Sequence, residues 1–403
     1  MSLKIKNFLL NYFFLFFDIY LISLFIDLSS FSCDYSTVAV VSKVVRIISY
    51  LYFLARLIIL FPIYKKKIID MLKKYSSFKL LSLIFIIFIA AIIINFGLYV
   101  KNRRFLYALL IIFAAYQVDY KKIIKHIFCL QIIMTSIFVL GAISGLTQNY
   151  MIHRGSISRY SLGYIYPTFL AQMILFSSIL YIYLKKFNVS VEYLATVQIL
   201  NFFSYFITNS RTEFFLLEII IFGLLMYSFF PCFFEKRKSF LKKILKLLTY
   251  TFPIFPVLTL AVSLLYPLGG IFNKVNSLLS GRLYLFYINV KTHGLSLFGN
   301  NVEILGNGLK TKMKYGDYQY NYIDSEYLQV LFQNGIIVGI TFIVILYILI
   351  IMLYKNKKYN ELFICLVYLF FGLINPRIIN FAFSPVLFLI IPTISEFYKG
   401  AIK

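Results

Sequence analysis

Long apolar runs separated by polar segments recur from one end of the chain to the other. A membrane-spanning α-helix needs about 20 predominantly apolar residues, and twelve runs reach or approach this length. They cover residues 8–28, 38–62, 80–100, 105–117, 127–146, 167–184, 190–208, 212–230, 247–267, 335–354, 361–375 and 380–396. The pattern predicts an all-α polytopic membrane protein with about 12 transmembrane helices. Residues 1–403 are expected to form a single integral membrane domain.

The run at residues 105–117 fits this pattern least well. It is short, and the basic segment KNRR (101–104) before it is assigned to the outside by the alternation of spans. Either 105–117 is a tilted or partial helix, or residues 80–117 form a hairpin that does not fully cross.

The basic residues are divided unevenly between the two sets of loops. The chain has 30 Lys and 10 Arg, and 23 Lys with only one Arg (Arg237) fall in the loops on the side of the N-terminus, among them residues 63–79. These loops hold 24 Lys and Arg, against 13 on the other side. Because an excess of basic residues marks the cytoplasmic face, the N-terminus is expected in the cytoplasm. Seven Arg lie on or near the opposite side: Arg103, Arg104, Arg154, Arg159, Arg211, Arg282 and Arg377.

Two polar segments stand out on that opposite side. The larger, residues 268–334, is predicted to be an extracytoplasmic loop, and its many Tyr, Leu and Phe residues favour order rather than disorder. Within it, residues 280–292 have helical periodicity, and Ser280 is positioned to cap the helix. One face of that helix carries its apolar positions: Leu283, Phe286, Tyr287 and Val290. The second segment, residues 147–168, is polar, aromatic and basic.

Composition supports the membrane assignment. The mean hydropathy is +0.85 and 61% of the residues are hydrophobic, which excludes an ordinary soluble globule. The net charge of +25 does not indicate nucleic-acid binding, since most of the excess lies in short loops where it orients helices and meets anionic lipid headgroups. The four Cys lack the spacing of a disulfide framework or a metal site. The first apolar run is too long for the hydrophobic region of a signal peptide.

Arginine on the outer side opposes the usual charge bias. Its rigid guanidinium grips phosphate or carboxylate through two hydrogen bonds. Any single Arg has the alternative of snorkelling or forming a structural ion pair, but Lys would serve that purpose as well and is scarce there. We therefore expect an anionic, phosphorylated substrate. The candidate substrate-binding residues are Arg154, Arg159, Arg211, Arg282, Arg377 and Tyr164.

Tyr164 is included because outer tyrosines can stack on glycans, although an interfacial aromatic belt is the alternative for most of them. The candidate catalytic residues are Asp324, Glu326 and His293. The alternative for the two acids is capping of the helix that follows them, and for the His a place on the polar surface. No Walker P-loop, H-E-x-x-H motif or cluster of metal ligands is present, so neither a cofactor nor a metal is expected.

Several motifs resemble those of bacterial Wzy-type polysaccharide polymerases, within the wider group that includes O-antigen ligases. They are RYSLGYIYPT (159–168), SRTE (210–213), SGRLYL (280–285), SLFGN (296–300) and DSEYLQVLFQNGIIVG (324–339). The last also looks like the ligase pattern H-N-x9-G, with Asp324 in place of the His, Ser325 in place of the Asn, and Gly335 at the same spacing. The missing His counts against a ligase.

The resemblance implies a fold similar to C-type glycosyltransferases, in which Arg159, Arg211 and Arg282 hold the lipid pyrophosphate. It implies polymerisation of undecaprenyl-pyrophosphate-linked oligosaccharide repeat units into capsule, exopolysaccharide or O-antigen at the outer leaflet of the bacterial cytoplasmic membrane. Pyrophosphate is a good leaving group whose charge Arg can neutralise without metal. A carboxylate would deprotonate the attacking hydroxyl, with Asp324 the first choice and Glu326 or His293 the second.

The partners so implied are the lipid-linked oligosaccharide, the lipid bilayer, and flippase and chain-length regulator proteins. Two alternatives stay open: an O-antigen ligase-like transferase, and a lipid-linked oligosaccharide flippase or transporter. A transporter would place charges along a cavity inside the spans. The main charges within the predicted spans are Asp18, Lys43, Arg46, Arg56 and Glu218.

Overall fold

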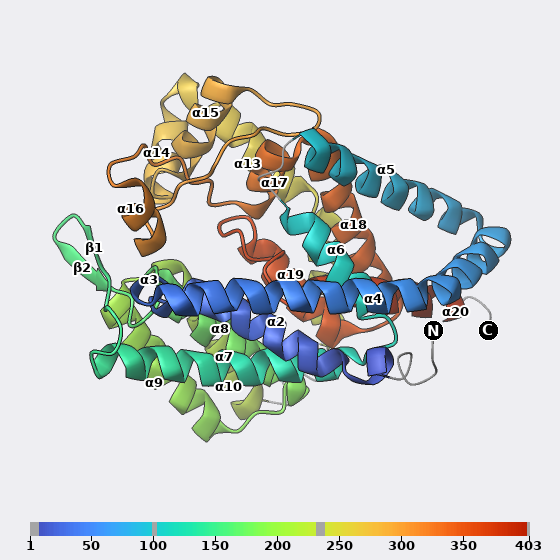
Figure 1. The fold of residues 1–403 in the computed structure, drawn as a ribbon, viewed down its shortest axis with the longest axis horizontal. Helices are drawn as coiled ribbons and strands as arrows, with labels where there is room; N and C mark the ends of the chain where they lie inside the picture. The colour runs from blue at the N-terminus through green and yellow to red at the C-terminus, as the bar shows by residue number, and fades with distance from the viewer. Residues whose placement is uncertain (1–7, 99–102, 231–237, 401–403) are drawn as a thin grey trace.

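The computed structural model describes residues 8–98, 103–230 and 238–400, which form α-helices and one short β-hairpin (Figure 1). The first elements are α2 (Phe13–Leu28), α3 (Phe31–Asp34), α4 (Ser36–Lys74), α5 (Ser76–Leu98), α6 (Arg104–Ala114), α7 (Tyr120–Ile143), β1 (Met151–Arg154), β2 (Ile157–Tyr160), α8 (Thr168–Leu184), α9 (Val191–Thr208) and α10 (Arg211–Phe229). The remaining elements are α12 (Lys238–Thr251), α13 (Ile254–Leu264), η1 (Tyr266–Leu268), α14 (Ile271–Leu278), α15 (Arg282–His293), α16 (Leu309–Tyr315), α17 (Glu326–Asn334), α18 (Ile336–Lys355), α19 (Tyr359–Phe371), η2 (Val386–Leu389) and α20 (Ile390–Gly400).

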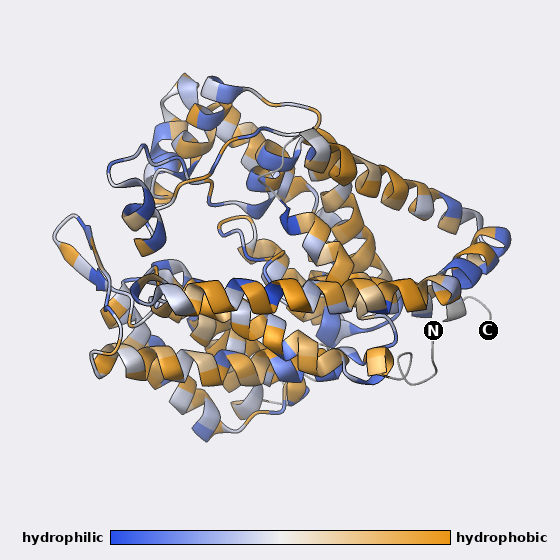
Figure 2. Cartoon of the chain, viewed as in Figure 1, coloured by the Kyte–Doolittle hydropathy of each residue, from blue (hydrophilic) through white to orange (hydrophobic). Residues whose placement is uncertain are grey.

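Five of the described helices are long and apolar enough to cross a membrane, namely α4, α5, α7, α10 and α18. The pair α12 and α13 makes a sixth candidate, bent by 50°. Hydrophobic residues predominate along most of the helices (Figure 2). Many of their large apolar side chains are exposed, with Phe206 of α9 78% exposed and Ile219 of α10 69% exposed. Contiguous apolar surface of this extent requires lipid rather than water around it. The chain is an all-α membrane protein.

One large apolar core holds the helices together. α2 packs against α4 and α7, α8 packs against α7 and α9, and α18 packs against α5 and α19. Phe17 of α2, Phe53 of α4 and Phe176 of α8 are fully buried in this core. In Figure 1, α4 runs across the middle of the molecule, with α7 to α10 on one side of it and α13 to α18 on the other. The packing of these helices fixes the positions at which the polar segments 147–168 and 268–334 connect to the bundle.

Helix α4 differs from the sequence prediction. A span at 38–62 followed by a basic loop at 63–79 was expected, whereas one helix of 39 residues continues through Pro62 to Lys74. At 1.5 Å per residue this helix is about 58 Å long, roughly twice the hydrocarbon thickness of a bilayer. The Lys-rich residues therefore lie on the projecting end of a helix, since Lys is a good helix former and its side chain needs only access to water.

Two C-terminal spans are also interrupted. The predicted span at 247–267 is divided into α12 and α13 at Phe252 and Pro253, because proline cannot continue the hydrogen-bonding pattern of the preceding helix. The predicted span at 380–396 begins with turns, and regular structure starts only at η2, directly after Pro385. The irregular chain before η2 is packed within the bundle, which is the setting that such backbone requires at membrane depth.

The segment 268–334 is ordered and carries a small apolar core of its own. Phe286, Ile323 and Phe332 are buried in it, with Leu328 and Leu331 beside them. The predicted helix is confirmed as α15, on which Leu283 and Phe286 are buried while Tyr287 and Val290 are half-buried.

The predicted capping role of Ser280 is wrong. Ser280 has a φ of +57° and Gly281 a φ of +86°, so the chain enters α15 through two residues in left-handed conformation. The Ser280 hydroxyl instead accepts a hydrogen bond of 2.7 Å from Arg154.

The other polar segment, residues 147–168, contains the β-hairpin. β1 and β2 pair antiparallel, with Arg159 opposite Ile152. Gly155, with a φ of +61°, lies in the turn between them, where glycine is favoured. The hairpin brings Arg154 and Arg159 towards the segment that contains α15.

Candidate functional site

A cavity of about 1300 Å³ lies between the helix bundle and the segment 268–334. Its walls come from α2, α4, α6, the β1–β2 hairpin, the starts of α8, α10, α15, α16 and α17, the end of α14, and irregular chain that includes residues 374–381. Ten Lys or Arg line the cavity, against only three Asp or Glu: Lys43, Arg46, Arg103, Arg104, Arg154, Arg159, Arg211, Arg282, Lys310 and Arg377, with Glu213, Asp324 and Glu326. So many cations in one cavity repel one another, and a multiply charged anion would relieve that repulsion.

Seven of the nine residues predicted from the sequence line this cavity. They are Arg154, Arg159, Arg211, Arg282, Arg377, Asp324 and Glu326. They come from the β1–β2 hairpin, α10, α15, the start of α17 and the chain after α19.

Tyr164 and His293 do not line the cavity. Tyr164 is fully buried, its hydroxyl shares a 2.7 Å hydrogen bond with Thr135, and its ring packs edge-on against Phe138. It is a core residue and not a glycan platform. His293 is exposed at the end of α15, with its ring 6.2 Å from that of Phe332. The structure therefore separates His293 from the two acids with which the sequence grouped it.

Arg159 of β2 and Arg211 of α10 both line the cavity, but the protein holds their side chains to different extents. The Arg159 side chain is buried, and its Nε donates to the Thr208 carbonyl at 2.5 Å. Burial lowers the pKa of Arg159, an effect that the Tyr166 phenol opposes, but a guanidinium keeps its charge. Arg211 is exposed, and within the described residues it has no hydrogen bond or ion pair. Arg159 is a fixed charge, and Arg211 is free to meet a ligand.

Arg282, the first residue of α15, forms an ion pair of 3.3 Å with Asp324. Burial raises the pKa of Asp324 above its usual range, while the charges of Arg282 and Arg377 oppose that rise. The pair still reaches water, with the Asp324 side chain 23% exposed. An anion that bound Arg282 would compete directly with this carboxylate.

Arg377 is held rigidly in the irregular chain after α19. Its guanidinium lies over the rings of Phe169 and Phe383, at 4.8 and 4.9 Å, and its Nε donates to Gln172 at 2.8 Å. The Gln172 amide in turn donates to the buried Glu213 at 2.9 Å. With a further donation from Nη1 to the Pro376 carbonyl at 3.1 Å, these contacts hold Arg377 in the wall of the cavity.

Glu326 opens α17, and only 2% of the residue is exposed. Its Oε2 accepts a hydrogen bond of 2.8 Å from the Ile378 N–H, and its own N–H donates to the Gly372 carbonyl. Burial raises the pKa of Glu326 to about 7, against the opposing effects of the Arg104 charge and the Ile378 N–H. The carboxyl therefore ties α17 to the chain that carries Arg377.

Five further basic residues line the cavity without having been predicted as site residues: Lys43, Arg46, Arg103, Arg104 and Lys310. Arg46 of α4 forms an ion pair of 2.6 Å with Asp27, and Lys310 of α16 pairs with the same carboxylate at 3.4 Å. This contact links the segment 268–334 to the bundle. The available signal was the charge inside the apolar run 38–62, because an ionisable residue at membrane depth usually faces a cavity or a partner.

Three tyrosines of the bundle also line the cavity. The rings of Tyr50 and Tyr107 are stacked at 4.2 Å, and Tyr20 lies 5.7 Å from Tyr50. Stacked aromatic rings beside a cationic region offer flat apolar surface and hydroxyls to a sugar. They form an aromatic wall that the sequence did not single out.

The donor set of the cavity suits an anion better than a metal ion. Among the residues that the structure describes, no group of three or more His, Cys, Asp or Glu is placed to hold a metal. Guanidinium groups from several directions can instead share the charge of one phosphate or pyrophosphate.

Comparison with protein-family models, curated proteins and solved structures found no match for this chain. The fold and the site define a class: an all-α membrane protein with a cationic cavity lined by three acids.

Proposed function

We propose that this chain is a Wzy-type polymerase of surface polysaccharide. It would transfer a growing glycan from undecaprenyl pyrophosphate to the next lipid-linked repeat unit, with flippase and chain-length regulator proteins as further partners. The observation that carries the proposal is the cavity in which Arg159, Arg211, Arg282 and Arg377 meet Asp324. It combines the cations that a pyrophosphate needs with an acid that a glycosyl transfer needs.

The proposed reaction displaces the lipid pyrophosphate from the anomeric carbon of the growing glycan. A hydroxyl of the acceptor sugar attacks that carbon, its oxygen forms the new glycosidic bond, and the bond from carbon to pyrophosphate oxygen breaks with both electrons leaving on the pyrophosphate. Arg211 and Arg282 bind the pyrophosphate as its charge grows, which stabilises the transition state. The hydroxyl proton passes to Asp324.

Asp324 is the better base of the two acids. Its carboxylate reaches the cavity and is paired with Arg282, so binding of pyrophosphate to Arg282 would release it for proton transfer. Glu326 is buried and accepts the Ile378 N–H. We assign Glu326 a positioning role, in which it holds the chain next to Arg377.

The proposal includes the topology from the sequence: about twelve spans, a cytoplasmic N-terminus, the segment 268–334 outside, and a bacterial cytoplasmic membrane. The six candidate spans count towards this number. Shorter apolar helices, among them α6, α8 and α19, would contribute the others as tilted or partial spans.

A strain that lacks this chain tests the proposal. Its surface glycan is separated by gel, and its lipid-linked intermediates are identified by mass spectrometry. Single repeat units on the lipid carrier at the outer leaflet, without polymer, are the expected result. Long polymer that stays on its carrier would indicate a ligase instead, and repeat units retained on the inner leaflet would indicate a flippase.

A further inference from the structure

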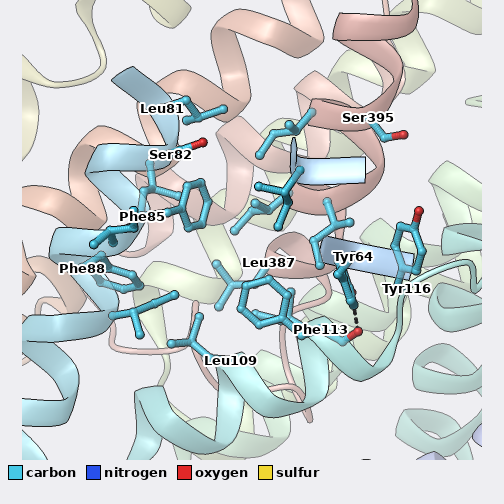
Figure 3. A pocket seen from close by; sticks show the side chains of 18 of the residues that line it. Tyr64, Leu81, Ser82, Phe85, Phe88, Leu109, Phe113, Tyr116, Leu387 and Ser395 are labelled. Atoms are coloured by element: carbon cyan, nitrogen blue, oxygen red, sulfur yellow. Dashed lines mark hydrogen bonds between the residues drawn. The ribbon is translucent and has the colours of Figure 1, made fainter. Parts of the chain in front are cut away.

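A second cavity, of about 300 Å³, lies between α4, α5, α6, α18 and α20 (Figure 3). Apolar side chains make up most of its wall, including Leu81, Phe85 and Leu109, which Figure 3 labels. Ile68 and Ile86 belong to the same wall and are also exposed, so the cavity reaches the surface of the bundle. Its volume falls at the lower end of ligand-binding pockets.

The two ends of this cavity differ in chemistry. At one end the rings of Phe88 and Phe342 both pack edge-on against Phe105, at 5.6 and 5.1 Å, and close the space. At the other end Lys67 donates hydrogen bonds to Ser395 at 2.5 Å and to Tyr116 at 3.3 Å. The cavity surface is almost entirely apolar, and the Lys67 ammonium lies at its edge with Ser395 and Tyr116. This arrangement suits an amphiphile whose hydrocarbon enters the cavity and whose anionic head stays beside Lys67.

The Lys67 end of the cavity lies in a part of α4 with an excess of positive charge. In the described part of the chain, no carboxylate forms an ion pair with Lys67. Four further lysines lie on the same end of α4: Lys65, Lys66, Lys73 and Lys74. Asp70 is the sole acid among residues 64–74. Such a basic cluster attracts anionic lipid headgroups.

We propose that this cavity binds one acyl chain of an anionic phospholipid whose phosphate lies at Lys67. The lipid belongs to the leaflet on the side of the Lys-rich loops. Water does not fill an apolar cavity, and an empty one forfeits the dispersion contacts of its wall, so hydrocarbon is the occupant that the wall favours. The inference does not depend on the function proposed above.

The bound chain would also support the neighbouring site. Ala108 of α6 lines both cavities. Arg104, the first residue of α6, lines the cationic cavity and donates a hydrogen bond of 3.2 Å to Gln329. Hydrocarbon packed against α6 would keep Arg104 in place.

Tryptophan fluorescence tests the proposal, because the chain contains no Trp. Phe85→Trp reports on the cavity, and Phe206→Trp reports on the bulk bilayer from an exposed position on α9. Each variant is placed in nanodiscs of unlabelled phosphatidylcholine. Brominated phosphatidylglycerol is added in increasing fractions to one series, and brominated phosphatidylcholine to the other. We expect half-maximal quenching of Phe85→Trp at about a fivefold lower fraction of brominated phosphatidylglycerol, and equal quenching of Phe206→Trp by both lipids.

Lys67→Gln in the Phe85→Trp background should remove the preference for phosphatidylglycerol. Lys66→Gln, which removes the same charge from an exposed neighbour, should keep it. Three results would overturn the proposal: equal quenching of Phe85→Trp by both lipids, equal effects of the two Lys variants, or stronger relief of quenching by unlabelled undecaprenyl phosphate than by unlabelled phosphatidylglycerol.

If Phe85→Trp does not fold, native mass spectrometry of the tryptophan-free protein gives the same decision. A retained phosphatidylglycerol on wild type and Lys66→Gln, but not on Lys67→Gln, supports the site, and its retention by all three contradicts it.

Discussion

At the scale of single residues, the two neighbouring acids at the start of α17 have different surroundings. Asp324 is half-buried and paired with Arg282, whereas Glu326 is buried and accepts a backbone N–H. Only Ser325 separates them in sequence, and both lie at the start of the same helix, so local spacing does not distinguish their surroundings. Their difference arises because Glu326 faces the chain after α19, a contact across more than 40 residues that no local pattern reveals.

Replacement of Asp324 by Asn should lower polymer synthesis by about 10²- to 10⁴-fold, because an amide cannot accept the hydroxyl proton. Asp317→Asn is the matched control, since Asp317 is exposed in the same segment and does not line the cavity. Polymer is measured on gels at equal membrane levels of the two variants. Similar polymer from both variants would remove Asp324 from its role as the base.

Glu326 should make stability depend on pH. Burial raises its pKa to about 7 in the folded protein, above the unfolded value near 4.5, so the folded state holds the proton more tightly and loses stability as pH rises between these values. The loss amounts to about 3 kcal/mol. Glu326→Gln stays neutral, so its melting temperature relative to wild type should rise between pH 5 and pH 8. Thermal unfolding in detergent measures this, and a constant difference would contradict the burial of an ionisable Glu326.

At the scale of elements, the junction of α17 and α18 depends on close backbone contact. Gly335 lies between the two helices with a φ of +97°, and a Cβ there would meet the Leu297 carbonyl and the Gly299 nitrogen. Gly299, with a φ of +98°, is packed equally closely against the backbone at Gln333 and Asn334. This junction holds the helix that begins with Glu326.

Gly335→Ala should therefore be far more damaging than Gly316→Ala. Both positions have positive φ, which costs about 1–2 kcal/mol for a residue with a Cβ, but no atom lies within 4 Å of a Cβ at Gly316. The backbone clash at Gly335 should add at least about 2 kcal/mol. Thermal unfolding of the two variants measures the difference. Equal destabilisation would mean that the backbone at the junction of α17 and α18 can shift to accommodate a Cβ.

Apolar runs were sufficient to predict most of the helices, since a span in lipid must be helical to satisfy its own backbone. The prediction of order and of a helix in 268–334 also succeeded, because its apolar residues are spaced to form one face. The pattern missed the length of α4, because Lys continues a helix as readily as it ends a span, and it missed the irregular chain before η2, whose apolar residues pack in the bundle.

At the scale of the whole molecule, the cavity joins segments that lie far apart in sequence. The excess of Arg on one side predicted which of them would meet, and Arg154, Arg159, Arg211, Arg282 and Arg377 all line the cavity. Their partners were not predictable, because the contacts of Arg377 with Phe169 and of Arg159 with Thr208 depend on how the helices pack. Tyr164 and His293 were misplaced because neither a motif nor a place on the outer side gives the direction of a side chain.

The proposed orientation predicts the accessibility of two basic segments. In a background without Cys, Lys312→Cys in α16 should react with a membrane-impermeant thiol reagent on intact cells. Lys66→Cys on the projecting end of α4 should react only after the cells are made permeable. Both side chains are exposed or partly exposed, so burial does not explain a difference. The reverse pattern of labelling would show that the protein has the opposite orientation, with the cationic cavity on the cytoplasmic side.

The most direct measurement of the central claim is the polymer made by Arg211→Ala, with Arg282→Ala beside it. Lys274→Ala is the control, because Lys274 is an exposed cation on α14 that does not line the cavity. At equal membrane levels, we predict wild-type polymer from Lys274→Ala. Each Arg variant should make about 10- to 100-fold less, as expected for the loss of hydrogen bonds to a charged group, with single repeat units accumulating on the lipid carrier. Full-length polymer at wild-type levels from both Arg variants would contradict pyrophosphate binding in this cavity.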